Sequence, residues 1–276
     1  AIQAWYESAT PSSRRRPQRY SDLAITTVLV IKRVFRLTLR AAQGFIDSIF
    51  SLMNVPLRCP DYSCVSRRAK SVNVSFKTPT RGEIAHLVID STGLKVFGEG
   101  EWKVKKHGQE RRRIWRKLHL AVDSNTHEII CADLSLNNVT DSEAFPGLIR
   151  QTHRKIRAAS ADGAYDTRLC HDELRRKKIS ALIPPRKGAG YWPGEYADRN
   201  RAVANQRMTG SNARWKWTTD YNRRSIAETA MYRVKQLFGG SLTLRDYDGQ
   251  VAEAMALVRA LNKMTKAGMA ESVRIA

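Results

Sequence analysis

The sequence predicts an α/β protein in which a mixed five-stranded sheet follows a small all-α region. Between residues 21 and 72 apolar residues recur at helical spacing. From residue 85 onward, three successive strand patterns are followed by alternating helical and strand patterns. We therefore expect a flexible basic lead-in at 1–20, a helical domain at 21–72, a linker at 73–84, an α/β domain at 85–240 and a C-terminal helical extension at 241–276.

Three helices are expected in the helical domain. The first begins at Ser21, the second follows Thr38, and Asp61 is placed to cap a short third helix. That third helix is polar and basic, and it carries Arg67 and Arg68. Two apolar helices followed by a basic one are typical of a helix-turn-helix DNA-binding domain. A plain helical bundle with a solvated third helix has the same pattern, but we favour DNA binding.

Five strands are expected in the α/β domain. In chain order the strand patterns lie at 86–90, 117–123, 128–134, 156–162 and 179–183. A helix that Asp141 is placed to cap separates the third strand from the fourth, and a helix opened by Asp166 and Thr167 separates the fourth from the fifth. Three strands followed by helix, strand, helix and strand form the ribonuclease-H-like order, which predicts that the first and fourth strands are neighbours.

The charge of the chain points to a polyanionic partner. The chain has 48 Lys+Arg against 26 Asp+Glu, a formal net charge of +22, spread along the sequence and not confined to one tail. Such an excess strengthens and accelerates binding to nucleic acid. No apolar run is long enough to cross a membrane, no secretory signal is visible, and the four cysteines form no CxxC pair. These features predict a cytoplasmic protein with reduced thiols and no membrane partner.

Two segments of the α/β domain have the composition of DNA-contacting loops. The segment at 102–117 is rich in basic residues, including Lys105, Lys106, Arg111, Arg112 and Arg113, with Glu110 as the one opposing charge in 103–117. We interpret it as a DNA-contacting hairpin, against the alternative of a solvated loop.

The second segment is the long insertion at 184–220, in which Trp192 and Trp215 lie among basic residues. These aromatic residues are suited either to stack on an unpaired base or to pin the loop to the core, and the sequence leaves both open.

One predicted helix, at 220–238, carries an unusual set of side chains on one face. At about 100° per residue, Tyr221 and Lys235 lie about 20° to either side of Glu228, and Arg224 lies about 40° away. A surface ion pair between Arg224 and Glu228 is one explanation of the carboxylate. The other is that Glu228 binds a metal ion while the neighbouring side chains hold phosphates.

Two aspartates favour the metal-binding interpretation. Asp90 and Asp162 each come at the C-terminal end of a predicted buried strand, and these two strands are expected to be neighbours. One such aspartate is commonly a turn cap, but three carboxylates brought together repel unless cations bind. Asp90, Asp162 and Glu228 are therefore the predicted catalytic residues and ligands of two Mg²⁺ or Mn²⁺ ions, which activate a water or 3′-hydroxyl for attack on phosphorus.

Other polar residues compete for these roles with lower priority. Asp123 falls in a turn, Asp133 lies within a strand, and Asp166 resembles a helix cap. His119 and His171 are more commonly solvated or satisfied histidines than catalytic ones.

These residues resemble the DDE transposases of bacterial insertion sequences, and most closely the insertion-sequence-five family. The run Tyr221-x2-Arg224-x3-Glu228-x6-Lys235 is the signature of that superfamily, and the sequences around Asp90 and Asp162 match its first two acidic regions. The resemblance implies binding of inverted-repeat ends, strand cleavage and transfer of 3′ ends into target DNA. It also implies a nucleoprotein complex containing a homodimer or larger assembly, associated with the bacterial nucleoid.

The resemblance leaves two alternatives and one departure. Family members usually begin with more sequence before the point where this chain starts, so we expect part of the end-recognition region to be absent. A transposase-derived DNA-binding regulator without catalysis is the first alternative, but it gains nothing from clustered carboxylates. A ribonuclease-H-like nuclease acting on RNA–DNA hybrids is the second, and the helix-turn-helix pattern disfavours it.

Overall fold

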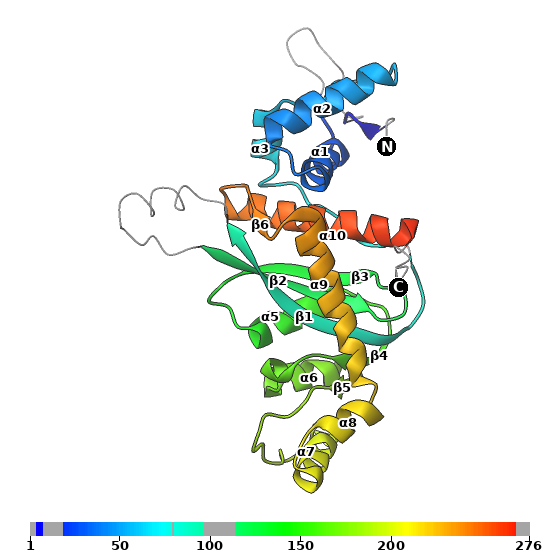
Figure 1. The fold of residues 1–276 in the computed structure, drawn as a ribbon, viewed down its shortest axis with the longest axis vertical. Coiled ribbons are helices and arrows are strands. Elements are labelled where there is room, and N and C mark those ends of the chain that lie inside the picture. The colour runs from blue at the N-terminus through cyan, green and yellow to red at the C-terminus, as the bar shows by residue number, and fades with distance from the viewer. Residues whose placement is uncertain (1–3, 8–18, 79, 97–113, 269–276) are drawn as a thin grey trace, which may run out of the picture. The chain divides into compact units, whose positions relative to one another are not determined.

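The computed structural model describes residues 4–7, 19–78, 80–96 and 114–268, and Figure 1 shows the order of its elements. Two compact units divide the chain. The helical unit comprises 1–76, 95–114 and 234–264, and the sheet unit comprises 77–94, 115–233 and 265–276. The basic segment around Lys105, Lys106 and Arg111–Arg113 and most of the lead-in lie outside the described residues.

The helical unit contains the three predicted N-terminal helices. They are α1 (Asp22–Val34), α2 (Leu39–Leu52) and α3 (Tyr62–Arg68). The side chains of Ser21, Thr38 and Asp61 cap them by accepting a backbone N–H of the first turn, which confirms the three predicted helix starts. Ile25, Leu29 and other apolar residues are fully buried between the helices. The apolar spacing therefore specifies both the helices and their core.

The C-terminal helix also belongs mainly to the helical unit. Most of α10 (Tyr247–Ala267) clusters with α1 to α3. Arg259 donates to the carbonyl of Ser75 over 2.6 Å. Inside the unit, the fully buried carboxylate of Glu253 accepts from Lys32 over 2.7 Å and Arg33 over 3.1 Å. This buried ion cluster joins α1 to α10.

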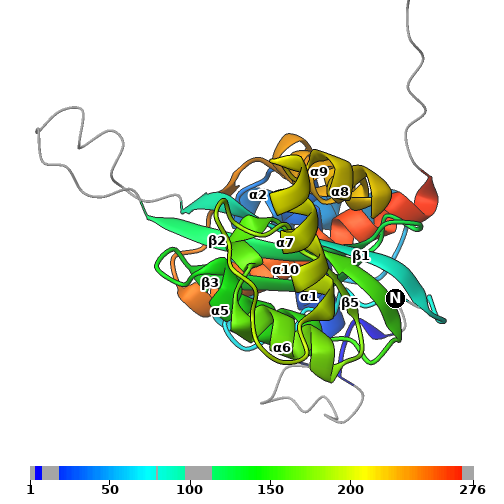
Figure 2. The same ribbon diagram turned by 90° about the horizontal axis from the view of Figure 1, so that it is seen from below.

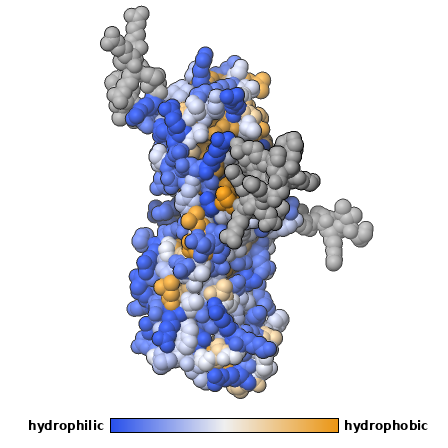
Figure 3. Space-filling model, turned by 90° about the vertical axis from the view of Figure 1, so that its left-hand side faces the viewer, coloured by the Kyte–Doolittle hydropathy of each residue, from blue (hydrophilic) through white to orange (hydrophobic). Residues whose placement is uncertain are grey.

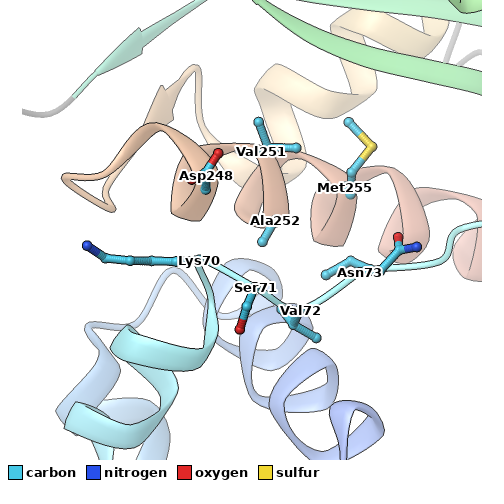
Figure 4. Close-up of a pocket in the computed structure, with 9 residues that line it drawn as sticks. Lys70, Ser71, Val72, Asn73, Asp248, Val251, Ala252 and Met255 are labelled. Atoms are coloured by element: carbon cyan, nitrogen blue, oxygen red, sulfur yellow. The ribbon is translucent and has the colours of Figure 1, made fainter.

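A small open groove runs along α10 in the same unit. Its volume is about 230 Å³, and its lining includes the segment at 70–73 and Asp248, Val251, Ala252 and Met255 of α10. Figure 4 shows this segment running beside α10, with the side chain of Ala252 pointing toward it. At the end of this segment, Lys70 forms an ion pair with Asp246 over 3.0 Å. None of the predicted catalytic residues lines this groove.

The sheet has the predicted ribonuclease-H-like topology. Its strands are β1 (Ile84–Val96), β2 (Trp115–Asp123), β3 (Ile129–Leu136), β4 (Ile156–Ser160) and β5 (Ser180–Leu182), in the order β3-β2-β1-β4-β5. β2 and β3 are antiparallel, whereas β4 pairs in parallel with both β1 and β5. The first and fourth strands are therefore neighbours, as expected. A short strand that was not predicted, β6 (Ser241–Leu242), pairs with the end of β1.

Two helices cover one face of this sheet. Figure 2 shows α5 (Asp141–Arg150) and α6 (Arg168–Arg176) on the opposite side of the sheet from α9 (Ser225–Phe238). Leu87 and Ile89 of β1 pack there with Phe145 and Leu174 in the main core cluster. We expected Asp141 to cap α5, but the cap is Thr140. Its side chain accepts from the amide of Glu143 and completes a capping box with that residue.

The insertion at 184–220 is not an irregular loop. It contains α7 (Ala197–Thr209) and α8 (Ala213–Thr218), which we did not predict. Gly210 ends α7 in the left-handed conformation, with φ of 71°. The sequence did not predict α7 because its residues do not form a strong apolar stripe at helical spacing.

Figure 3 shows one face of the molecule, where hydrophilic residues predominate and hydrophobic ones form small groups between them. In the described ranges, no helix is both long and apolar enough to cross a lipid bilayer. All four cysteines are free thiols.

Candidate active site

Asp90 lies where the pairing of β1 with β4 ends. We predicted that the first strand ends at this residue, but β1 continues to Val96. The register between β1 and β4 runs only as far as Val88 opposite Ser160, so Asp90 is two residues beyond the last pair. Its side chain is 18% exposed. Asp90 therefore lies just beyond the β1–β4 pairing without being the last residue of β1, whose end pairs with β6.

Asp162 follows β4 on the neighbouring strand. Two residues after the strand ends at Ser160, its side chain accepts the amide of Ala164 over 2.9 Å and caps the short 3₁₀ helix η2 (Gly163–Tyr165). This cap is the structural role that the sequence allowed for a strand-end aspartate. It occupies one carboxylate oxygen, Oδ1, so the cap is compatible with a second role for the other oxygen.

Glu228 lies in the first turn of α9, and Arg224 connects it to Asp90. Nη1 of Arg224 donates to Oδ2 of Asp90 over 2.9 Å, while Nη2 donates to Oε1 of Glu228. The i−4 ion pair, one of the two explanations of Glu228, therefore forms, and the same guanidinium also reaches the first aspartate. One positive charge stands between two of the three predicted metal ligands.

Tyr221 does not lie on the exposed face of this helix, which corrects the prediction. Residues Tyr221–Arg224 form the 3₁₀ helix η3, and α9 begins only at Ser225. A 3₁₀ turn winds about 120° per residue, which moves Tyr221 about 80° from its α-helical position. The ring is 6% exposed, and its hydroxyl donates to the carbonyl of Ala161 over 3.2 Å. Tyr221 therefore supports the backbone beside Asp162 and is not presented on the exposed face of α9.

Lys235 lies two turns after Glu228 on α9 and is exposed. Within this single helix, seven residues place it about 20° from Glu228 around the axis, as expected. Its side chain is available to a phosphate on that face.

The electrostatic surroundings of Asp90 resemble those of a cation site. Burial raises the pKa of Asp90, and the negative charge of Asp162 raises it further, against the opposing effects of the Ser91 amide and Arg224. The pKa of Tyr221 is raised to about 12, mainly by burial, and the charges of Asp162, Asp90 and Glu228 contribute. All three carboxylates thus act on the same small region, where their repulsion favours a cation.

The three carboxylates are the type of ligand that binds a hard divalent cation, but they are not grouped closely enough to share one in this structure. Oxygen donors are what Mg²⁺ and Mn²⁺ prefer. Across the described part of the chain, no three His, Cys, Asp or Glu side chains are already grouped as metal ligands. Arg224 explains the gap, because its guanidinium stands between Asp90 and Glu228. Sharing an ion requires Arg224 to release one carboxylate, and the side chain of Glu228, 55% exposed, has room to turn once Arg224 releases it.

A polar network that sequence reasoning missed lies behind Asp90. The amide of Ser91 donates to Oδ1 of Asp90 over 2.8 Å, and its hydroxyl donates to Oδ1 of Asp141 over 2.9 Å. Lys117 and His119 lie 3.6 and 3.8 Å from the same carboxylate. His119 is buried and also bonds Ser135, so it is a satisfied histidine, the commoner of the two cases weighed. The alternation of Lys117 and His119 in a strand was the signal that could have grouped them.

Asp166 is a buried ion-pair partner, where the sequence indicated a helix cap. Thr167 caps α6, while Asp166 accepts from Arg199 of α7 at 2.8 and 3.1 Å and from His171 at 3.2 Å. Asp166, His171 and Arg199 are all less than 9% exposed. The pair joins the insertion to the turn that begins at Asp162.

The two tryptophans predicted to contact DNA are engaged inside the sheet unit. Trp215 is 4% exposed and packs with Ala202 and Tyr221. Trp192 is half-buried, with the guanidinium of Arg199 over its ring at 3.6 Å. Both therefore follow the alternative in which aromatic residues pin the insertion to the core. Trp217, 78% exposed, is the tryptophan of this segment that faces solvent.

Of the two arginines of α3 that were predicted to contact DNA, one is paired within the protein and the other is exposed. Arg68 forms an ion pair with Asp22 over 2.5 Å and donates to the carbonyl of Tyr20, so its charge is used within the helical unit. Arg67 is exposed and remains available to a partner.

The comparisons with known proteins bear on this arrangement. Residues 81–263, more than half of the chain, match the family described as Transposase DDE domain. The chain belongs to this DDE transposase family. Residues 1–99 match a second family of the same description. Members are typically phosphoryltransferase enzymes, and DNA transposition is the function that the family implies. Divalent metal ions are the cofactors that DDE transposases generally use.

Two solved transposase structures are similar at low identity. A piggyBac transposase synaptic complex with hairpin DNA shares 12% identity, covers 96% of this chain and 69% of its own, and has a TM-score of 0.45. A pre-cleavage Mos1 transpososome shares 11% identity, covers 95% of this chain and 82% of its own, and has a TM-score of 0.27. The family assignment rests on the sequence match alone.

Proposed function

We propose that this DDE transposase is catalytically active and that Asp90, Asp162 and Glu228 hold two Mg²⁺ or Mn²⁺ ions. The observation that carries the proposal is the bridge of Arg224 between Asp90 and Glu228, with Asp162 acting on the same region. Carboxylates from β1, the β4 turn and α9 converge on one positive charge. When bound, the ions would supply Lewis acidity toward a scissile phosphate and its attacking hydroxyl.

The protein side chains have separate tasks in this proposal. Asp90, half-buried just beyond the β1–β4 pairing, provides a fixed donor, and Ser91 holds its carboxylate in one orientation. Glu228 lies at the exposed side and can adjust to the ions. Arg224, once it releases a carboxylate, is placed to neutralise a phosphate oxygen, which a guanidinium binds with two donors. No covalent protein nucleophile is required.

The substrate in this proposal is double-stranded DNA carrying the inverted-repeat ends of an insertion sequence. The complete Tyr221-x2-Arg224-x3-Glu228-x6-Lys235 run supports assignment to the insertion-sequence-five group. The net charge of +22 and the exposed Arg67 and Lys235 support phosphate contacts. Binding of two ends implies a homodimer or larger complex, with transfer of the cut 3′ ends into target DNA.

The experiment is a cleavage assay with matched binding measurements. Purified protein is incubated with Mg²⁺ and labelled duplexes from the genomic DNA on either side of its coding sequence. We expect wild-type nicking at the element end. Asp90→Asn, Asp162→Asn and Glu228→Gln should each reduce the rate by at least about 100-fold, or ~2.7 kcal/mol, with DNA affinity nearly unchanged. Glu195→Gln, at a carboxylate with 87% side-chain exposure, is the control.

Two results would overturn the proposal. Full cleavage by Asp90→Asn, Asp162→Asn or Glu228→Gln would show that the substituted residue is not catalytic. Specific DNA binding by the wild type without cleavage in Mg²⁺ or Mn²⁺ favours the non-catalytic regulator instead. Cleavage of RNA–DNA hybrids in preference to duplex DNA would identify a nuclease.

A further inference from the structure

Tyr232 presents an aromatic ring on the same helix as Glu228, one turn further along. It is 63% exposed, which is unusual for a tyrosine beside a catalytic centre whose other aromatic residues are buried. Four residues along α9 place it about 6 Å from Glu228 along the axis and about 40° around it. Thr229, on the same side of the helix, is exposed as well.

Nothing within the described parts of the chain accounts for this ring. Among those residues, Tyr232 has no hydrogen bond, ring contact or cation above its face. Other aromatic residues of the sheet unit differ: Tyr221 packs against Trp215, and the half-exposed Tyr191 lies under the guanidinium of Arg207 at 4.5 Å. An exposed tyrosine adds little to helix stability, since its helix propensity is lower than that of alanine or lysine. The ring is therefore available to an external partner.

The charges around Tyr232 identify the class of that partner. Arg224, the last residue of η3, lies just before the start of α9, and the exposed Lys235 follows Tyr232 by three residues on α9. A ring between a guanidinium and an ammonium fits a nucleic acid strand, whose phosphates meet the cations and whose bases stack on the ring. An apolar protein partner would instead require a wider apolar surface around the tyrosine.

We propose that Tyr232 stacks on an unpaired DNA base next to the phosphate that Glu228 serves. This inference rests on the proposed function, because that function places a DNA strand end at Glu228. Stacking is tolerant of base identity, since every base has an aromatic face. Tyr232 thus contributes to holding the strand end in place, and it does not take part in the chemistry.

Direct contact is tested by photocrosslinking. The full chain carrying Asp162→Asn, which is not expected to cut DNA, is bound to a duplex with a short 3′ extension of thymidines, one of them 4-thiothymidine. After irradiation, mass spectrometry should find the nucleotide on the α9 peptide at Tyr232. Attachment at Trp217, the exposed tryptophan of α8, and not at α9 would overturn the proposal. The measurement does not depend on how any Tyr232 variant folds.

Binding measurements provide the second arm. In the same Asp162→Asn background, Tyr232→Ala should weaken binding to the extended duplex about tenfold, or ~1.4 kcal/mol, with the affinity for a blunt duplex unchanged. Tyr232→Phe should bind like tyrosine. The control is Leu237→Ala, which removes a 40% exposed apolar side chain about 180° around α9 from Glu228.

Equal weakening by Tyr232→Ala and Leu237→Ala, or equal loss on both duplexes, contradicts stacking. Since no cleavage is measured here, a catalytically inactive wild type would overturn the proposed function without deciding the role of Tyr232.

Discussion

Arg224 donates a hydrogen bond of 2.9 Å to Asp90, a residue 134 positions earlier in the chain. The same guanidinium donates to Glu228. Interactions with Tyr221, Asp90, Glu228 and Asp162 raise the pKa of Arg224, although burial opposes the shift, so its charge is permanent. A cation built into the chain thus occupies the place where the proposed function requires a metal ion.

Arg224 and a divalent ion should therefore compete. Replacing it by glutamine removes one positive charge beside two carboxylates while keeping hydrogen-bond donors. We expect Arg224→Gln to bind Mn²⁺ about tenfold more tightly in the absence of DNA, a gain of ~1.4 kcal/mol. Isothermal titration calorimetry measures this directly. Arg223→Gln, at the exposed neighbouring arginine, should leave the affinity close to that of the wild type. Weaker Mn²⁺ binding by Arg224→Gln would show that the guanidinium organises the ligands and does not compete with the ion.

The buried pair of Asp166 and Arg199 should be critical for the stability of the sheet unit. Asp166→Ala leaves the guanidinium of Arg199, which is 4% exposed, without its carboxylate. The free energy of unfolding should fall by about 3–5 kcal/mol, as measured by urea denaturation. Lys155→Ala removes an exposed ion pair with Glu83 and should cost no more than ~1 kcal/mol. Similar losses from the two variants would mean that the buried pair contributes no more than a surface pair.

Glu253 should be equally important to the helical unit. Its carboxylate is the acidic partner of two buried cations, Lys32 and Arg33, and also accepts the amides of Thr243 and Leu244. Glu253→Gln removes the charge with little change in shape. We expect a loss of about 3 kcal/mol or more in unfolding free energy, whereas Lys70→Ala, in a solvent-exposed pair, should lose ~1 kcal/mol at most. A thermal unfolding scan in which both variants match the wild type would contradict this.

Glu173 should make stability depend on acidic pH. Hydrogen bonds and charges of Arg176 and Arg150 lower its pKa to about 2, below the ordinary value of 4.5, even though burial acts in the opposite direction. A lowered folded-state pKa stabilises the protein above the unfolded-state value and loses that contribution as the pH falls toward 2. The stability difference between wild type and Glu173→Gln should therefore be constant above pH 5 and shrink below pH 4.5. A difference that is independent of pH between 3 and 6 would show that the pair is screened.

The sheet and the helix starts could be predicted because each depends on local chemistry. Alternating apolar residues specify β2 and β3, and Ser21, Thr38 and Asp61 cap the helices that they precede. The order of elements alone predicted that β1 and β4 are neighbours, and the structure pairs them in parallel. These features do not require knowledge of distant contacts.

The errors came where tertiary contacts decide the outcome. Tyr221 fits an α-helical face in sequence, but the 3₁₀ turn and its bond to the carbonyl of Ala161 bury it. Trp215 and Trp217 are two residues apart in a basic segment, and only packing separates the buried one from the exposed one. Asp166 has the sequence position of a helix cap, but its carboxylate forms an ion pair with Arg199 of α7, a helix that was not predicted.

The most direct test of the shared cation site is a crystal structure of the wild-type protein with Mn²⁺, using anomalous diffraction to locate the ions. We predict Mn²⁺ at about 2.0–2.6 Å from carboxylate oxygens of Asp90 and Asp162, with Glu228 among the ligands and Arg224 released from at least one carboxylate. Mn²⁺ bound elsewhere, with Arg224 still bridging Asp90 and Glu228, would contradict the site.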